Sequence, residues 1–289
     1  MKSQVGAVDY IRDYQTELET IQATFKPREF TRWKPKSDFP ELIITVPDKH
    51  DELILAPVFD AHLGSTQHDE ERLLKDLNWI SETPNVLSWN GGDATENITN
   101  SKMGHTTLDN EEQILLATQR FGLIQHKLMW SHPGNHEDRT RQLSGVSSGR
   151  RIADNLKVPY FTDYCFATIK WRGNNFRILS HHGAGGATTA GAQRNSARKE
   201  LVWHQPDILW TGHLHQPLTD TILVVDHDQE SGRLYERESL VIISPSYLKY
   251  FGGYAAKFRL APGKRGLSAA ILQSDGRIDA NIHARGKRI

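Results

Sequence analysis

Five short apolar segments of this 289-residue chain each lead into a motif of metal-ligating residue types, and four of the five motifs contain glycine. The five motifs are Asp60-Ala61-His62, Gly91-Gly92-Asp93, Gly134-Asn135-His136-Glu137, His181-His182-Gly183 and Gly212-His213-Leu214-His215. In α/β sheets, ligand sites gather at the carboxyl ends of strands. Carboxylate, imidazole and amide groups are common ligands of divalent metals. Each motif alone arises by chance in many loops, but five in succession after apolar segments indicate one site.

Apolar segments alternate with helical patterns from residue 41 onward, which predicts an α/β fold with helices covering sheets. Strands are predicted at 41–47, 53–59, 85–90, 127–131, 176–180 and 207–211, and helices at 70–80 and 111–124. The last part of the chain is strand-like at 221–226, 239–244, 257–261 and 269–273. We expect these last segments to complete a second sheet packed on the first.

The N-terminal region differs from the rest of the chain. Residues 8–25 have apolar residues at three- and four-residue steps, which predicts an amphipathic helix. This helix either packs on the body of the protein or contacts a partner or a second copy. Residues 26–40 are basic, proline-punctuated and carry Trp33, so they indicate an extended connector. The connector is either a solvated linker or a contact for nucleic acid. We therefore predict a helix and basic linker over 1–40 and one domain over 41–289.

Charge and cysteine content narrow the class of protein. Lys and Arg number 35 and Asp and Glu number 35, so the formal net charge is zero. Broad binding of duplex nucleic acid or of an anionic membrane is therefore disfavoured, although local basic patches remain possible. The single Cys165 excludes an intrachain disulfide and a thiolate zinc cluster. We find no signal-peptide pattern and no membrane-span pattern, and we expect a cytoplasmic protein without membrane contact.

The order D-x-H, G-D, G-N-H-E, H-G and G-H-x-H, over about residues 53–215, resembles the calcineurin-like metallophosphoesterase superfamily. The resemblance implies two packed mixed β-sheets flanked by helices, an αββα sandwich, here with an N-terminal helical extension. It also implies two divalent cations. Manganese is the first expectation, and iron, zinc and nickel suit the same nitrogen and oxygen ligands.

The resemblance also implies a set of ligands. Asp60, His62 and His215 would hold one cation, Asn135, His182 and His213 would hold the other, and Asp93 would be shared. The family pattern of a ligand followed by glycine matches His182-Gly183. His181, one residue earlier, is left open as the alternative ligand.

Other residues near the motifs have more than one interpretation. In the family, the position of His136 protonates the leaving oxygen or stabilises transition-state charge, and the alternative is a structural histidine bonded to a carbonyl. Glu96 either orients His136 or is a solvated loop carboxylate. Arg194 and Arg198 either contact a substrate phosphate or lie on an amphipathic helix that follows a flexible loop.

Family roles imply hydrolysis of a phosphate ester by a metal-activated hydroxide, since metals lower the pKa of bound water from about 15.7 towards 7. Residues 60–64 resemble the DNA-repair nuclease branch, and residues 134–139 resemble Ser/Thr protein phosphatases. Residues 182–186 and 212–216 resemble uncharacterised metallophosphoesterases of phages and prokaryotes. If the protein is phage-encoded, we expect it to act in the host cytoplasm.

Departures from these branches guide the choice of substrate. No arginine follows Asp93 closely, as it does in protein phosphatases, and residues 216–289 are too few for a nuclease capping domain as well as the second sheet. We therefore favour a phosphodiesterase acting on a nucleotide or nucleic acid, which includes a nuclease. The alternatives are a phosphomonoesterase or protein phosphatase, and a non-catalytic scaffold, which retention of every ligand position disfavours.

Overall fold

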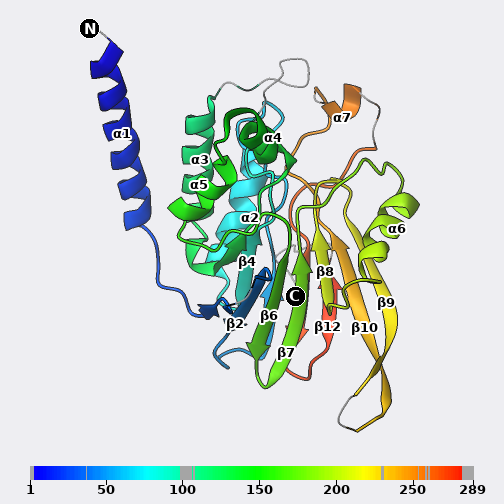
Figure 1. The fold of residues 1–289 in the computed structure, drawn as a ribbon. Helices are drawn as coiled ribbons and strands as arrows, with labels where there is room; N and C mark the ends of the chain where they lie inside the picture. The colour runs from blue at the N-terminus through cyan, green and yellow to red at the C-terminus, as the bar shows by residue number, and fades with distance from the viewer. Residues whose placement is uncertain are drawn as a thin grey trace.

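Two packed β-sheets form the centre of the computed structural model, which describes residues 3–36, 38–97, 106, 108–228, 231–252, 254–257, 259 and 261–281 (Figure 1). The seven-stranded sheet contains, in spatial order, β1 (Thr31–Trp33), β2 (Glu41–Thr45), β6 (Cys165–Trp171), β7 (Asn174–Ser180), β8 (Ile208–Thr211), β10 (Leu234–Ile243) and β9 (Leu218–His227). The five-stranded sheet contains β12 (Ile278–Asn281), β11 (Ala269–Gln273), β3 (Glu52–Leu55), β4 (Val86–Asn90) and β5 (Leu128–Ser131). Parallel and antiparallel neighbours occur in both sheets, so both are mixed.

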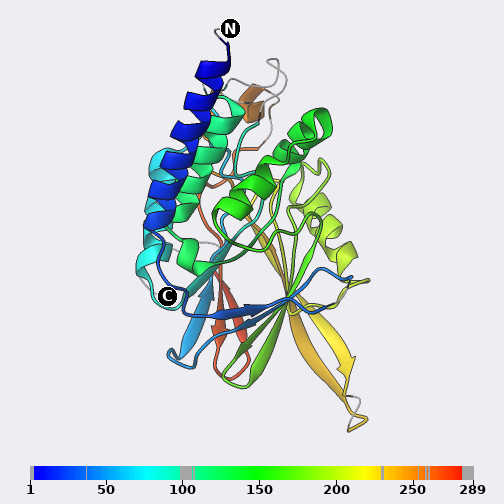
Figure 2. The same cartoon turned by 60° about the vertical axis from the view of Figure 1, so that its left-hand side comes forward.

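Helices cover the outer faces of the two sheets (Figures 1 and 2). The described helices are α1 (Ser3–Ala23), α2 (Glu70–Glu82), α3 (Asn110–Gly122), the 3-10 helix η1 (Gln125–Lys127), α4 (Asn135–Ser144), α5 (Ser148–Asn155), α6 (Ala190–Glu200) and α7 (Tyr254–Lys257). Apolar side chains of α2, α3 and α5 pack on the five-stranded sheet, and Ala197 of α6 packs on the other sheet. The predicted fold class, two mixed sheets flanked by helices, is confirmed.

Three tryptophans fill the space between the sheets near the strand ends. Trp89 of β4 stacks on Trp130 of β5 with ring centroids 4.5 Å apart, and meets Trp210 of β8 edge-on at 5.1 Å. All three side chains are fully buried. Burying an aromatic ring of this size contributes up to about 4–6 kcal/mol. The strands that lead into three of the five motifs are therefore anchored in the common core.

The C-terminal strands differ from the prediction. They do not complete one sheet, because β9 and β10 extend the seven-stranded sheet while β11 and β12 extend the five-stranded one. The predicted strand at 257–261 is wrong where the structure describes it: Lys257 ends α7 and Arg259 lies in a turn. Five alternating residues are too few to specify a strand.

The N-terminal helix packs on the body of the protein. Leu18 is buried, the Gln22 side chain donates to the Asn155 carbonyl (2.8 Å), and the Asn155 amide donates to the Tyr14 hydroxyl (3.1 Å). A partner contact through this helix stays a prediction. The connector contains a strand, since β1 pairs with β2, and its Trp33 is 60% exposed. Among the described helices, none is long and apolar enough to cross a membrane.

Candidate metal centre

The loops that follow five strands meet at one end of the two sheets. Strands β3, β4 and β5 run parallel, as do β7 and β8, so their carboxyl ends point the same way within each sheet. The His62 N–H donates to the Asp93 carbonyl (2.8 Å), which joins two loops of one sheet. The His213 N–H donates to Oδ2 of Asp60 (2.9 Å), which joins the two sheets. The predicted motifs therefore surround one point.

One group of side chains consists of Asp60, His62 and His215. Oδ1 of Asp60 lies 3.2 Å from Nε2 of His215 and 3.8 Å from Nε2 of His62. The two imidazole Nε2 atoms are 3.3 Å apart. Asp60 and His62 are buried, and His215 is half-buried. One ligand atom from each residue therefore faces a common centre.

The second group consists of Asp93, His182 and His213, with Asn135 beside them. Oδ2 of Asp93 lies 3.2 Å from Nε2 of His182. One end of the Asn135 amide lies 3.2 Å from the same oxygen and 2.8 Å from Nδ1 of His213. Oδ2 of Asp93 is also 3.8 Å from Nε2 of His62, so Asp93 stands between the two groups.

The donor atoms fit divalent cations in both chemistry and spacing. Ligand atoms about 2.1 Å from one cation lie roughly 3.0–3.4 Å from one another in octahedral or tetrahedral coordination. The Asp60–His215 and Asp93–His182 pairs are each 3.2 Å apart. One end of the Asn135 amide lies between Asp93 and His213, and a cation at this place would take the amide oxygen. The residues present therefore fit two cations that share Asp93.

Three histidines of the centre are each held by one ring nitrogen and present the other nitrogen to the cluster. The contacts join Nδ1 of His182 to the Gly91 carbonyl (3.0 Å), Nε2 of His213 to the Gly185 carbonyl (2.8 Å) and Nδ1 of His62 to Oε2 of Glu96 (3.0 Å). Outer partners of this kind fix the tautomer and orientation of metal-binding histidines. The free ring nitrogens are therefore already aimed at the carboxylates.

Backbone strain is concentrated at the same place. Nine non-glycine residues in the described part of the chain have a positive φ, and five of them are predicted ligands. These five are Asp60 (51°), His62 (49°), Asp93 (48°), His213 (66°) and His215 (55°). A left-handed conformation costs such a residue on the order of 1–3 kcal/mol and persists where the surrounding structure holds it, typically at functional sites.

Two motif glycines lie so close to a carboxylate that no side chain fits at their positions. A Cβ atom on Gly134 would lie 1.9 Å from Oδ1 of Asp93. A Cβ atom on Gly212 would lie 2.6 Å from Oδ2 of Asp60. Any side chain at either position would displace a carboxylate from the centre, which explains why glycine precedes Asn135 and His213 in these motifs.

His136 lies at the edge of the centre. Its Nε2 is 3.8 Å from Oδ2 of Asp93, and its ring meets that of His62 edge-on at 4.6 Å. Its Nδ1 is 2.5 Å from the Glu96 carbonyl oxygen, whereas the nearest Glu96 carboxylate oxygen is 3.7 Å away. Glu96 is only 8% exposed, so it is not a solvated loop residue. It contributes its carbonyl to His136 and its carboxylate to His62.

Of the two adjacent histidines, the structure places His182 in the centre and His181 outside both groups. Nε2 of His181 lies 2.7 Å from Oε2 of Glu200, and its ring meets that of Tyr164 edge-on. The opposite orientation of the two rings follows from their place in β7 and its extension, since successive side chains of an extended segment point to opposite faces.

Two arginines that the sequence left open between a phosphate contact and a helix surface pair with an acidic side chain. Arg194 and Arg198 are on α6, and their Nε atoms are 3.5 Å and 2.6 Å from Oδ2 of Asp220. Arg139 is nearer to the centre, because one Nη lies 2.7 Å from the far end of the Asn135 amide. Sequence reasoning assigned Arg139 no role, although its four-residue spacing from Asn135 on a helix was a usable signal.

No family model and no curated protein matches this sequence, but solved structures do. Vacuolar protein sorting 29 from Cryptosporidium parvum is 13% identical over 80% of this chain and 97% of its own, with a TM-score of 0.35. A conserved uncharacterized protein from Streptococcus pneumoniae TIGR4, described as a predicted phosphoesterase, is 10% identical over 80% of this chain and 98% of its own, with a TM-score of 0.35. Vps29 from Entamoeba histolytica complexed with Zn is 12% identical over 79% and 97%, with a TM-score of 0.32. Scores below 0.5 do not decide a family.

What decides the fold is internal to the chain: the ordered motifs, the two mixed sheets with outer helices, and the meeting of the motif side chains at one point. The observed architecture is the sandwich of two mixed sheets between helices that the resemblance in the sequence implies.

The electrostatics of the candidate metal centre favour added positive charge. Burial by itself lowers the pKa of a histidine, but the charge and hydrogen bond of Asp93 and the charge of Asp60 raise the pKa of His182 to about 10. Burial is likewise outweighed at His62, where Glu96 and the two aspartates raise the pKa to about 9. Carboxylates that stabilise a positive charge on neighbouring imidazoles also stabilise a bound cation. A divalent cation would displace those protons.

Glu137 is a structural residue that sequence reasoning missed. Its carboxylate is buried and accepts hydrogen bonds from the backbone N–H groups of Asp93 (3.0 Å), Thr95 (2.8 Å) and Gly134 (2.7 Å) and from the Thr95 hydroxyl (2.8 Å). It thereby ties the loop after β4 to the first turn of α4. Its place in the G-N-H-E motif was the available signal.

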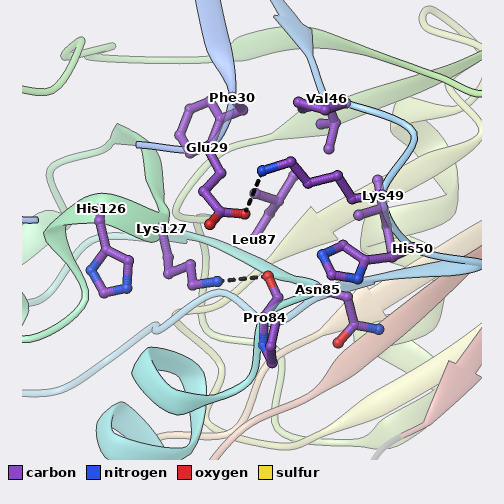
Figure 3. Close-up of a pocket in the computed structure, with 12 residues that line it drawn as sticks. Glu29, Phe30, Val46, Lys49, His50, Pro84, Asn85, Leu87, His126 and Lys127 are labelled. Carbon is purple, nitrogen blue, oxygen red and sulfur yellow. Dashed lines mark hydrogen bonds and ion pairs between the residues drawn. The ribbon is translucent and has the colours of Figure 1, made fainter. Parts of the chain in front are cut away.

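A small cavity lies at the other end of the strands, where β4 and β5 begin (Figure 3). Lys127 donates there to the Pro84 carbonyl (2.7 Å), and Lys49 pairs with Glu29 (3.8 Å). None of the predicted site residues lines this cavity. Its Lys127, Lys49 and Glu29 side chains are engaged in holding the surrounding loops.

Proposed function

We propose that this chain is a phosphoesterase that uses two divalent cations, and manganese is the metal that we expect first. One cation would be held by Asp60, His62 and His215, the other by Asn135, His182 and His213, and Asp93 would be shared. The observation that carries the proposal is the set of three histidines, each tied at one nitrogen and aimed at two buried carboxylates with the other. When bound, the cations would supply an activated water nucleophile near neutral pH and positive charge for the phosphate.

The side chains set the charge of the site. Asp60 and Asp93 contribute two negative charges, and the amide and the neutral imidazoles contribute none. Two divalent cations would therefore leave the centre positive enough to attract a phosphate anion. Because both aspartates are buried, water screens this charge poorly and the attraction is strong.

His136 is suited to donate a proton to the leaving oxygen. Its Nδ1–H group donates to the Glu96 carbonyl, which fixes the ring and leaves Nε2 on the side of Asp93. Burial lowers the pKa of His136, while the charge of Asp93 acts in the opposite direction. A protonated Nε2 would therefore release its proton readily as the phosphate ester bond breaks.

A phosphodiester is favoured as the substrate because the centre offers few cationic side chains. In the described loop from Asp93 to Asn97 there is no arginine or lysine, and the Thr95 hydroxyl is bound to Glu137. A doubly charged monoester needs more positive contacts than a singly charged diester. We therefore propose a nucleotide or nucleic-acid phosphodiester, which includes a nuclease activity.

The test compares diesters with monoesters after reconstitution with Mn²⁺. Rates are measured on bis(p-nitrophenyl) phosphate and p-nitrophenyl phosphate, and on labelled single- and double-stranded DNA and RNA. We expect the higher kcat/KM for the diester, and no activity in Asp93→Asn. A higher value for the monoester would make the chain a phosphomonoesterase. A metal-loaded protein that hydrolyses none of these substrates would favour a non-catalytic scaffold and overturn the proposal.

A further inference from the structure

A basic and aromatic segment runs beside the loops of the metal centre. Residues 247–265 contain five lysines and arginines and five aromatic residues but no aspartate or glutamate, in a chain with zero formal net charge. A local concentration of one charge in a neutral chain raises the local concentration of an oppositely charged ligand. Alternating cationic and aromatic residues are typical of surfaces that bind single-stranded nucleic acids.

The segment is attached to ligand-bearing loops at both ends. The Tyr247 N–H donates to the Asp60 carbonyl (3.0 Å), and the Lys249 N–H donates to the Gln67 carbonyl (2.8 Å) in the same loop. Further along, the Ala261 carbonyl accepts from the side chain of Gln216 (2.6 Å), the residue after His215. Figure 1 shows α7, which belongs to this segment, at the same end of the molecule as α4.

Phe251 lies near the loop that carries Asp60. Four residues of chain span at most roughly 14 Å, so the Cα of Phe251 lies within that distance of the Cα of Tyr247, whose N–H contacts Asp60. Phe251 is 83% exposed, and Tyr250 meets its ring edge-on at 5.1 Å. An aromatic ring so exposed is a typical contact surface.

Three cations of the segment are exposed and uncompensated. Lys249, Lys257 and Arg259 have no ion-pair partner among the residues that the structure describes, whereas Arg265 pairs with Asp69. We define the basic aromatic strip by its five exposed or half-exposed residues. They are Lys249, Tyr250, Phe251, Lys257 and Arg259.

We propose that the basic aromatic strip binds a single-stranded polynucleotide and leads one of its phosphodiesters to the metal centre. This inference rests on the proposed function. The cations neutralise backbone phosphates, and the aromatic rings stack on bases of any sequence. A duplex hides its base faces in the helix stack, and a phosphopeptide offers phosphate without a row of bases. The strip therefore matches a single strand better than either.

The test is equilibrium binding of a labelled 12-nucleotide single strand, followed by fluorescence anisotropy in EDTA so that no hydrolysis occurs. Phe251→Ala should weaken binding roughly 5- to 100-fold through lost stacking, with little change in salt dependence. The double variant Lys257→Ala/Arg259→Ala should weaken binding and reduce the slope of log K against log salt by about 1.4, since each phosphate contact in a single strand contributes about 0.7.

Matched controls are Trp203→Ala, an aromatic residue 80% exposed near α6, and Lys170→Ala, an exposed lysine on β6. Both should bind as the wild type does. Equal losses in the controls, equally tight binding of a duplex, or equally tight binding of a phosphopeptide of the same charge would each overturn the proposal. If the wild type bound the strand but hydrolysed no ester with metal present, the proposed function would fail while the binding result stood.

Discussion

Nδ1 of His62 lies 3.0 Å from Oε2 of Glu96, and neither atom has a further hydrogen-bond partner in the described part of the chain. Both side chains are buried, so the pair is shielded from water. The carboxylate orients the ring with Nε2 towards His215 and Asp60, and it increases the basicity of that nitrogen. Glu96 is therefore a positioning residue for a proposed metal ligand.

Glu96→Gln keeps the shape of the side chain but removes its charge. We expect metal affinity to fall about 10- to 100-fold, the usual effect of losing an outer partner of a metal-binding histidine. Competition with a chelating dye measures this affinity directly. Glu236→Gln, at an exposed glutamate of β10, is the matched control and should bind metal normally. Unchanged affinity in Glu96→Gln would show that the contact does not support a ligand.

Asp93 is the residue whose loss should affect both proposed cations. Oδ2 of Asp93 lies near His182 on one side and His62 on the other. We expect Asp93→Asn to hold at most one equivalent of metal by mass spectrometry and to lose turnover. Chelation should stop the wild-type enzyme, and Mn²⁺ should restore it. Two tightly held equivalents in Asp93→Asn, with Asp163→Asn as the exposed control, would refute a shared carboxylate.

The sequence predicted the layers and the position of the centre because strand ends and ligand motifs coincide in it. Asp60, Asp93 and His213 each follow an apolar strand directly, and the structure brings them together. The division of the last four strands between two sheets was not predictable, since pairing partners far apart in sequence leave no local pattern. The β6–β7 hairpin was predicted only in part, because residues 176–180 were recognised as a strand and residues 165–171 were not. The CFATIKW segment alternates buried and less buried positions, but no strong turn signal precedes it.

The contacts around the centre were also beyond the sequence. Spacing suggested that Glu96 would face His136, yet its carboxylate faces His62 and its carbonyl faces His136. Asn97, the next residue, has a left-handed backbone, and such a conformation is rarely predictable for a residue other than glycine.

His136→Ala tests the role of the histidine at the edge of the centre. Because His136 is not needed to hold either proposed cation, the variant should keep both equivalents of metal. Its rate should fall by roughly two or more orders of magnitude, the usual contribution of a general acid. The loss should be smaller for esters whose leaving groups need no proton, such as p-nitrophenolate. Loss of metal in this variant would make His136 a ligand instead.

Glu137→Gln tests the anchor between the loop after β4 and helix α4. An amide in place of the carboxylate would turn N–H donors towards the backbone N–H groups of Asp93 or Gly134, which would leave buried donors unpaired. We expect a loss of about 2–4 kcal/mol in the free energy of unfolding. Chemical denaturation measures it, and Glu82→Gln at the exposed end of α2 should have no comparable effect. An equal loss of unfolding free energy in both variants would show that Glu137 has no special structural role.

His132 gives the protein a stability that depends on pH. Trp130 Nε1–H donates to its Nε2 (3.0 Å), so the neutral ring carries its proton on Nδ1, which donates to the Phe161 carbonyl (3.0 Å). Burial lowers the pKa of His132 from its ordinary 6.5 to about 3. Between pH 6.5 and pH 3 the His132 side chain is protonated in the unfolded chain but neutral in the folded protein. This residue therefore makes the free energy of unfolding fall as pH falls from about 6.5 towards 3. In EDTA, His132→Gln should reduce the slope of unfolding free energy against pH by up to about 1.4 kcal/mol per pH unit in that window, and by nothing above pH 7.5. If the variant kept the wild-type slope, His132 would have to be protonated in the folded protein over the same pH range as in the unfolded chain.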